Sequence, residues 1–107
     1  MAWTVVFLDA RVEAEMEDQP PDIRARFDRI KTVIAEHGPL HVPPKWIKHI
    51  DGQLWELRMK GKDGIARAIY VTATSQRLVI LRVFTKKTQK TPLREIEIAK
   101  QRAKEVP

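Results

Sequence analysis

Apolar spacing in the N-terminal part of the chain changes from that of a strand to that of a helix. Residues 2–8 are rich in β-branched and aromatic side chains, which predicts a strand. Asp9 can cap a short helix that carries Val12 and Met16 on one face, and prolines 20 and 21 end that helix. A second helix begins at Pro21 and stops at His37-Gly38-Pro39. Its apolar residues recur at intervals of three and four and form a stripe that we expect to face a sheet: Ile23, Phe27, Ile30 and Ile34.

The remainder reads as a loop, three strands and a final helix. Residues 38–52 contain several prolines and predict an ordered loop. Residues 53–60 alternate between apolar and polar side chains, residues 65–73 form a second strand, and residues 78–85 are apolar on both sides except at Arg82. Thr91 is expected to cap the last helix, with Pro92 as its first residue. The inner stripe of this helix is Leu93, Ile96, Ala99 and Ala103.

This order, β-α-α-β-β-β-α, predicts one α+β domain over residues 1–107, with helices packed on a small sheet. The alternation at 53–60 puts Trp55, Leu57 and Met59 on the core side and Glu56, Arg58 and Lys60 on the polar side.

Composition narrows the chemistry that the domain can perform. The chain has no cysteine, which excludes disulfides and thiolate chemistry. Its apolar N-terminus is too short for a signal peptide or a membrane span, so we expect a cytoplasmic protein with no membrane contact. His37, His41 and His49 are too loosely spaced to suggest a metal site.

Charge is distributed unevenly along the chain. The formal net charge is +6, yet residues 9–22 hold six acidic and one basic side chain, and residues 82–104 hold eight basic and two acidic ones. This layout is consistent with a face for an anionic partner. A solvated surface that only confers solubility explains it equally well.

Three sequence blocks resemble a known family. They are LWELR at 54–58, RAIY at 67–70 and FTKKTQKTP at 84–92, which continues into Arg94-Glu95-Ile96. Together, and in this order, they resemble the HigB-like, phage-related branch of the RelE/ParE toxin superfamily along nearly the whole chain. The resemblance implies a twisted, mostly antiparallel sheet whose first strand lies parallel to its last.

The resemblance also implies a function. HigB-like proteins are toxins of type II toxin–antitoxin systems. They are metal-free endoribonucleases (mRNA interferases) that need no cofactor and cut translated mRNA, either in dependence on the ribosome or as free enzymes. A neighbouring antitoxin, in this branch a helix-turn-helix, HigA-like protein, holds them inactive. ParE relatives share the fold but inhibit gyrase without catalysis, so this alternative stays open.

Site residues follow from the resemblance and from the chemistry of RNA cleavage, in which cations stabilise a phosphorane. Arg67 corresponds to the strand arginine that holds phosphate, and Lys87, with Lys86 beside it, to the basic residue at the strand end. Flanking RNA is expected to bind to Arg58, Thr88, Gln89, Lys90 and Arg94. Arg67 and Lys87 are taken as surface residues, whose replacement by alanine should leave the thermal midpoint nearly unchanged.

The general acid and base are less well marked. Glu56 is the one carboxylate in the predicted strands and is either structural or a base, whereas Tyr70 should pack, because its alternation opposes that of Arg67. His49 is a further candidate. Several relatives carry a late tyrosine or histidine, but this chain has neither after Tyr70. That departure favours the gyrase inhibitor or a decayed module that only binds nucleic acid or antitoxin.

Two further residue types allow more than one interpretation. Arg82 either forms an ion pair beneath the helices or lines a cleft, and its parity groups it with Leu78, Ile80 and Phe84. Trp46, between Lys45 and Lys48, is a core residue or a contact for RNA or antitoxin. Trp3 and Trp55 are expected in the core.

Overall fold

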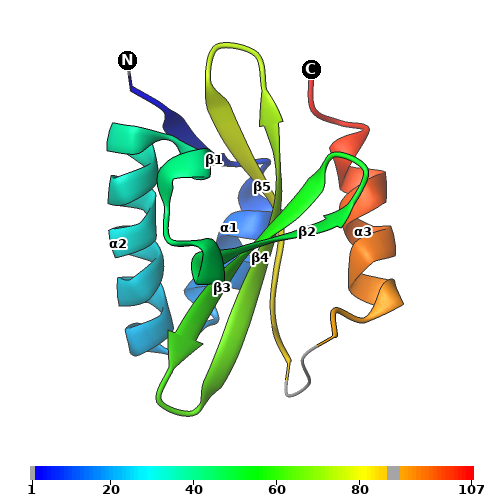
Figure 1. Cartoon of the computed structure of the whole chain (residues 1–107). Helices are drawn as coiled ribbons and strands as arrows, with labels where there is room; N and C mark the ends of the chain where they lie inside the picture. The colour runs from blue at the N-terminus through cyan, green and yellow to red at the C-terminus, as the bar shows by residue number, and fades with distance from the viewer. Residues whose placement is uncertain (1, 87–89) are drawn as a thin grey trace.

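A twisted five-stranded sheet forms the centre of the molecule (Figure 1). The computed structural model describes residues 2–86 and 90–107. The strand order is β1 (Thr4–Phe7), β5 (Arg77–Lys86), β4 (Gly64–Ala73), β3 (Leu54–Gly61) and β2 (Ile47–Asp51). β1 runs parallel to β5, and every other pair is antiparallel. The predicted α+β class and the parallel pairing of the first and last strands are therefore confirmed.

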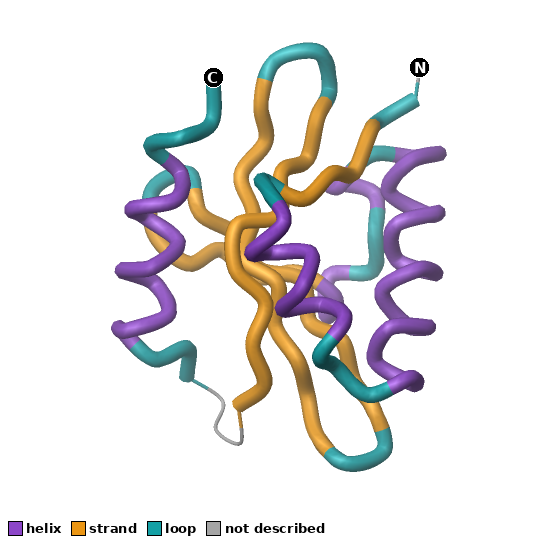
Figure 2. Tube along the Cα trace, turned by 180° about the vertical axis from the view of Figure 1, so that it is seen from behind, coloured by secondary structure: helices purple, strands orange, loops and turns teal. Residues whose placement is uncertain are grey.

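Helices cover both faces of this sheet, as the view from behind shows (Figure 2). α1 (Ala10–Glu17) and α2 (Pro21–His37) pack on one face, and α3 (Leu93–Ala103) packs on the other. Asp9 caps α1 by accepting a hydrogen bond from the Arg11 N–H at 3.0 Å. Gly38, which ends α2, has φ +84°, and a Cβ there would lie 2.9 Å from Trp3 Nε1, so both conformation and space require glycine.

Two apolar clusters fill the space between the layers. On the α2 face, the predicted stripe of four helix residues is buried against Leu57, Met59 and Tyr70. On the α3 face, Ile69, Val71, Leu81 and Phe84 pack with Ala99. β5 contributes to both clusters, which explains why its sequence is apolar on both sides.

β2 lies in the segment that the sequence predicted to be a loop. Residues 38–52 contain two short 3₁₀ helices, η1 (Pro39–His41) and η2 (Pro44–Trp46), followed by this strand. Its apolar residues Ile47 and Ile50 are three apart, which is not strand spacing, and a register shift between His49 and Asp51 accommodates them. β2 is thus an irregular edge strand, held by pairing with β3 and not by its own pattern.

The start of α3 also differs from expectation. The helix begins at Leu93, Pro92 occupies the cap position, and no side chain caps it. The Thr91 hydroxyl instead donates to Glu56 on β3. Leu93, predicted to face inward, is 74% exposed, because the first turn of α3 lies beyond the edge of its apolar cluster.

Arg82 lies on the opposite side of β5 from Leu78 and Ile80, contrary to its predicted parity. Ile69 pairs with Arg82 and Tyr70 with Ile80, so Leu81 is an extra residue that reverses the alternation. Arg82 Nη1 lies 2.7 Å from Glu15 Oε2, and its Nε lies 2.7 Å from Glu95 Oε1. Burial alone would lower the pKa of Arg82, but the hydrogen bonds to these two carboxylates raise it. The ion-pair alternative is the one that the structure confirms.

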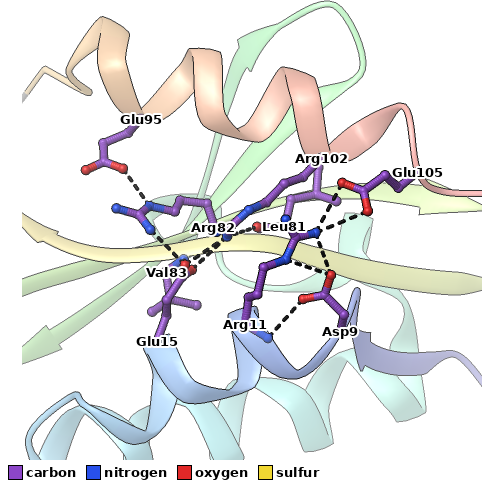
Figure 3. A network of polar contacts seen from close by, with 9 residues as sticks. All are labelled: Asp9, Arg11, Glu15, Leu81, Arg82, Val83, Glu95, Arg102 and Glu105. Carbon is purple, nitrogen blue, oxygen red and sulfur yellow. Dashed lines mark hydrogen bonds and ion pairs between the residues drawn. The ribbon is translucent and has the colours of Figure 1, made fainter.

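Glu15 connects three elements around this arginine (Figure 3). Its carboxylate accepts hydrogen bonds from the Val83 N–H at 3.0 Å and from Arg102 Nη1 at 2.9 Å, and Arg102 Nη1 also donates to the Leu81 carbonyl at 2.8 Å. The pairing of β1 with β5 stops at Ile80, so these side chains cover the edge of β5 that β1 leaves bare. The network also fixes α3 against β5, next to the polar cluster described below.

Candidate functional site

The pairing register of β3 with β4 places two arginines side by side on the face of the sheet that α3 covers. Arg58 on β3 pairs directly with Arg67 on β4. Like charges in cross-strand positions repel unless a counter-charge is present. Glu56, two residues before Arg58 on the same face, supplies it: Glu56 Oε1 lies 3.7 Å from Arg58 Nε and 3.8 Å from Arg67 Nε. We refer to these three side chains as the arginine–glutamate cluster.

Two members of this cluster lie inside the protein, whereas the side chain of Arg58 is 28% exposed. Glu56 is 0% exposed and Arg67 is 2% exposed. Burial lowers the pKa of Arg67, Glu56 opposes that effect, and Arg58 adds to it. The prediction that Arg67 is a surface residue is therefore wrong. Because Arg67 is buried, Arg67→Ala is no longer expected to leave the thermal midpoint unchanged.

Hydrogen bonding in the cluster is incomplete. Thr91 Oγ1 donates to Glu56 Oε2 at 2.8 Å, which satisfies one carboxylate oxygen. Among residues 2–86 and 90–107, four buried side-chain atoms have no hydrogen-bond partner, and all four belong to this cluster: Glu56 Oε1, Arg58 Nε, Arg67 Nε and Arg67 Nη1. Buried polar groups are normally paired, so this concentration of unused donors marks the cluster as a candidate anion-binding site.

A cleft of about 310 Å³ opens beside the cluster, a volume at the lower end of small-ligand pockets. We call it the basic cleft; the described residues that line it are Arg26, Lys45, Trp46, Arg58, Lys60, Ile65 and Arg67. Five of these seven residues are cationic and none is a carboxylate. A hollow with one sign of charge concentrates counter-ions, here anions.

Only some of the site residues predicted at the end of β5 and beyond it lie in the described structure. Lys86 pairs through its main chain with Ile65, and Ile65 lines the basic cleft. The end of β5 therefore lies next to the basic cleft. Lys87, Thr88 and Gln89 lie outside the described residues. Lys90 and Arg94 are exposed, and neither lines the basic cleft.

The acid–base candidates are separated by the fold. Tyr70 is buried on the α2 face, opposite Arg67, and burial raises its pKa to about 12. His49 Nε2 hydrogen-bonds with the Gly52 carbonyl oxygen at 2.8 Å, and its ring contacts Trp55 edge-on, at the β2–β3 turn. Of the three candidates, only Glu56 lies beside the arginines.

Sequence reasoning did not identify three cations that line the basic cleft: Arg26, Lys45 and Lys60. Each looked like an ordinary solvated charge, because α2, η2 and β3 are far apart in sequence. Trp46 packs against the apolar cluster of the α2 face and also lines the cleft, so both of its proposed roles remain compatible with its position.

Comparison with known proteins agrees with this architecture. The family model "Phage derived protein Gp49-like (DUF891)" matches residues 14–104. A chain from the archaeal RelE–RelB complex of Pyrococcus horikoshii OT3 is similar with a TM-score of 0.62 and 19% identity, over 79% of this chain and 96% of that chain. A double arginine-to-alanine mutant of the E. coli toxin RelE in the free state matches with a TM-score of 0.65 and 12% identity, over 100% of both chains.

At these identities the two structures establish a common fold. No curated protein matches the sequence. In the part of the chain that the structure describes, no helix is long and apolar enough to cross a membrane.

Proposed function

Because the chain belongs to the Gp49-like family of phage-derived proteins and has the RelE toxin fold, we propose that it is the toxin of a toxin–antitoxin pair. Its activity is that of a metal-independent endoribonuclease on translated mRNA, in the manner of HigB-like toxins. The observation that carries this proposal is the basic cleft, which five cationic side chains line beside the buried carboxylate of Glu56.

The proposed reaction places the scissile phosphate against Arg67, with Lys86, the last residue of β5, and Lys87, the next residue in the sequence, as further cationic groups. The RNA 2′-oxygen bonds to phosphorus and the bond to the 5′-oxygen breaks, while one proton leaves the 2′-hydroxyl and another joins the 5′-oxygen. The products are a 2′,3′-cyclic phosphate and a 5′-hydroxyl. Guanidinium N–H groups stabilise the extra negative charge of the phosphorane, and they do so best where water is excluded.

Glu56 has a positioning role in this proposal. Its distances of 3.7 and 3.8 Å to the two arginine Nε atoms exceed hydrogen-bond length, so it attracts both guanidinium groups without using their donors. Flanking phosphates would meet Arg58, Thr88, Gln89, Lys90 and Arg94.

An acidic antitoxin is the proposed partner, and a HigA-like, helix-turn-helix protein fits the resemblance best. The basic cleft suits a segment rich in Asp and Glu, which would cover the site and exclude RNA. The complex should then weaken as salt rises. We place both proteins, with their mRNA and ribosome, in the cytoplasm.

Gyrase inhibition is the second candidate, because no tyrosine or histidine lines the cleft among the described residues to act as general acid or base. The chain has no tyrosine or histidine after Tyr70, and Tyr70 lies on the opposite face of the sheet. A ParE-like protein needs no proton transfer.

One experiment separates these candidates. The chain is induced without its antitoxin, RNA 5′ ends are mapped, and the purified protein is assayed for inhibition of DNA supercoiling by gyrase. We expect new 5′-hydroxyl ends within translated mRNA, lost in Lys87→Ala and retained in Tyr70→Phe. Intact RNA together with inhibited gyrase would establish the ParE-like function, and RNA binding without either effect would indicate a decayed enzyme.

A further inference from the structure

A second basic hollow adjoins the basic cleft. It is an open groove between α2 and the β3–β4 turn, lined by Asp22, Ala25, Arg26, Arg29, Lys60, Gly61 and Lys62. Arg26 and Lys60 line both hollows, so the two adjoin at these side chains. We call the four cations of the groove, Arg26, Arg29, Lys60 and Lys62, the basic rim.

Among the described residues that line the groove, the one carboxylate is Asp22, and it is engaged with the main chain. Asp22 Oδ2 accepts a hydrogen bond from the Lys62 N–H at 2.8 Å, and Oδ1 accepts one from the Ile23 N–H at 3.0 Å. The bond from Lys62 is the main reason that the pKa of Asp22 is lowered. Asp22 therefore ties the β3–β4 turn to the start of α2 and leaves four cations on the two sides of the groove.

Close packing fixes the distance between these sides. A Cβ on Gly61 would lie 2.6 Å from Ile23 Cδ1 and 2.7 Å from Asp22 Oδ2, so the end of β3 lies directly on α2. The cations thus project from two elements that are held together, a preorganised arrangement that lowers the cost of binding an extended ligand.

We propose that the basic rim binds the sugar–phosphate backbone of single-stranded RNA on one side of the cleavage site. This inference rests on the proposed function of the basic cleft. The substrate strand would run from the cleft, past Lys60, onto the side of α2. Proteins that bind single-stranded nucleic acid usually hold its sugar–phosphate backbone in a positively charged groove.

The composition of the groove favours RNA over a protein partner. Protein interfaces have apolar centres, often with aromatic residues, whereas Ala25 is the largest apolar side chain that lines this groove. The half-buried Trp46 lies in the neighbouring cleft, where a base could stack. Contact at the rim itself would be with phosphates and independent of base identity.

The test uses Arg29→Gln/Lys62→Gln, because these two residues line the groove and not the cleft. The probes are fluorescent poly(U) and the dinucleotide UpU, with binding measured by anisotropy at several salt concentrations. We expect several-fold weaker binding of poly(U) and unchanged binding of UpU. The log–log salt slope for poly(U) should become shallower by about 1.4, at about 0.7 for each lost phosphate contact.

The matched control is Arg24→Gln/Lys31→Gln, on the same helix. Both residues are exposed, neither lines the basic cleft or the adjoining groove, and both double variants lower the formal net charge from +6 by two. The control should retain most of the poly(U) affinity. Equal losses in the two double variants, or no loss in either, would overturn the inference.

Measuring how each variant binds the antitoxin shows whether the rim is an RNA-binding surface or a protein interface. If Arg29→Gln/Lys62→Gln loses the antitoxin but keeps poly(U), the rim is a protein interface and the inference is wrong. If the wild type binds poly(U) through the rim but never cleaves RNA, the nuclease proposal fails while the rim proposal stands.

Discussion

Removing the charge of Glu56 should destabilise the protein more than removing that of Arg67. Glu56→Gln keeps the size of the side chain and an acceptor for the Thr91 hydroxyl, but it leaves two arginines paired across β3 and β4 without a counter-charge. One of them, Arg67, is almost completely buried. The protein must then hold an uncompensated charge in its interior.

The expected cost follows from this burial. Breaking a buried ion pair by removing one partner costs about 3–5 kcal/mol, and small domains are stable by only about 5–15 kcal/mol. For a domain of this size, a loss of about 3 kcal/mol lowers the thermal midpoint by roughly 12 °C or more. Glu56→Gln should therefore fold only marginally.

Arg67→Met has a different consequence. Glu56 keeps Arg58 at 3.7 Å and the Thr91 hydroxyl at 2.8 Å, and methionine fills most of the space. We expect a loss of about 1–2 kcal/mol, within the ordinary range of point mutants. RNA cleavage should nevertheless fall by about a hundred-fold or more, because phosphorane donors are lost.

The double variant Glu56→Gln/Arg67→Met completes the cycle. Both buried charges are gone, so it should be more stable than Glu56→Gln alone by about 2 kcal/mol. Urea unfolding, followed by the fluorescence of the three tryptophans, measures all four proteins. A Glu56→Gln variant within about 1 kcal/mol of wild type, or single effects that add within about 0.5 kcal/mol, would refute the argument.

Three further predictions concern the parts of the fold that support the site. Glu15→Gln should cost about 2 kcal/mol in urea unfolding, because Glu15 bonds Arg82, Arg102 and the edge of β5, whereas the exposed Glu13→Gln should cost almost nothing. The folded-state pKa of Asp22 is lowered from 3.8. The ionised carboxylate therefore contributes to stability above pH 3.8, and this contribution is lost as pH falls through the folded-state pKa. Asp22→Asn should flatten this part of the stability–pH curve, as measured by urea unfolding at several pH values. Gln76→Gly should raise stability by about 0.5–1 kcal/mol, as Gln76 has φ +54° in the β4–β5 turn; an unchanged urea midpoint would show that this conformation is not strained.

The main elements could be predicted from sequence because each carries its own pattern. The stripe of α2 has helical spacing, and β3 places Trp55, Leu57 and Met59 on the core side by simple alternation. These patterns depend only on which side of an element is buried. Once one face is assigned, the element is defined.

The candidate site, by contrast, cannot be predicted from the pattern of any single element. Glu56 and Arg67 appear as polar positions on alternating strands, yet they are buried, and Thr91, just before α3, returns to this face of the sheet to bond Glu56. The extra residue in β5 likewise moves Arg82 to the other side, and nothing in the apolar run marks it. Both features are set by contacts between distant segments, so periodicity cannot indicate them.

The buried charges are themselves an argument for function. Well-packed apolar residues in place of a buried ion pair are often neutral or stabilising, so stability alone does not account for the arginine–glutamate cluster. A purely structural cluster would also hydrogen-bond its donors, whereas Glu56 Oε1 and three arginine N–H positions form ion pairs at most and have no hydrogen-bond partner in the described structure. The cost of keeping such donors is understandable if a ligand uses them. The ligand must be anionic, because the described residues that line the adjoining cleft include five cations and no carboxylate, and a phosphate group suits a bidentate guanidinium. On this argument, inorganic phosphate or RNA should stabilise the wild type against urea and should stabilise Arg67→Met much less. Equal stabilisation of the two proteins would place the anion elsewhere.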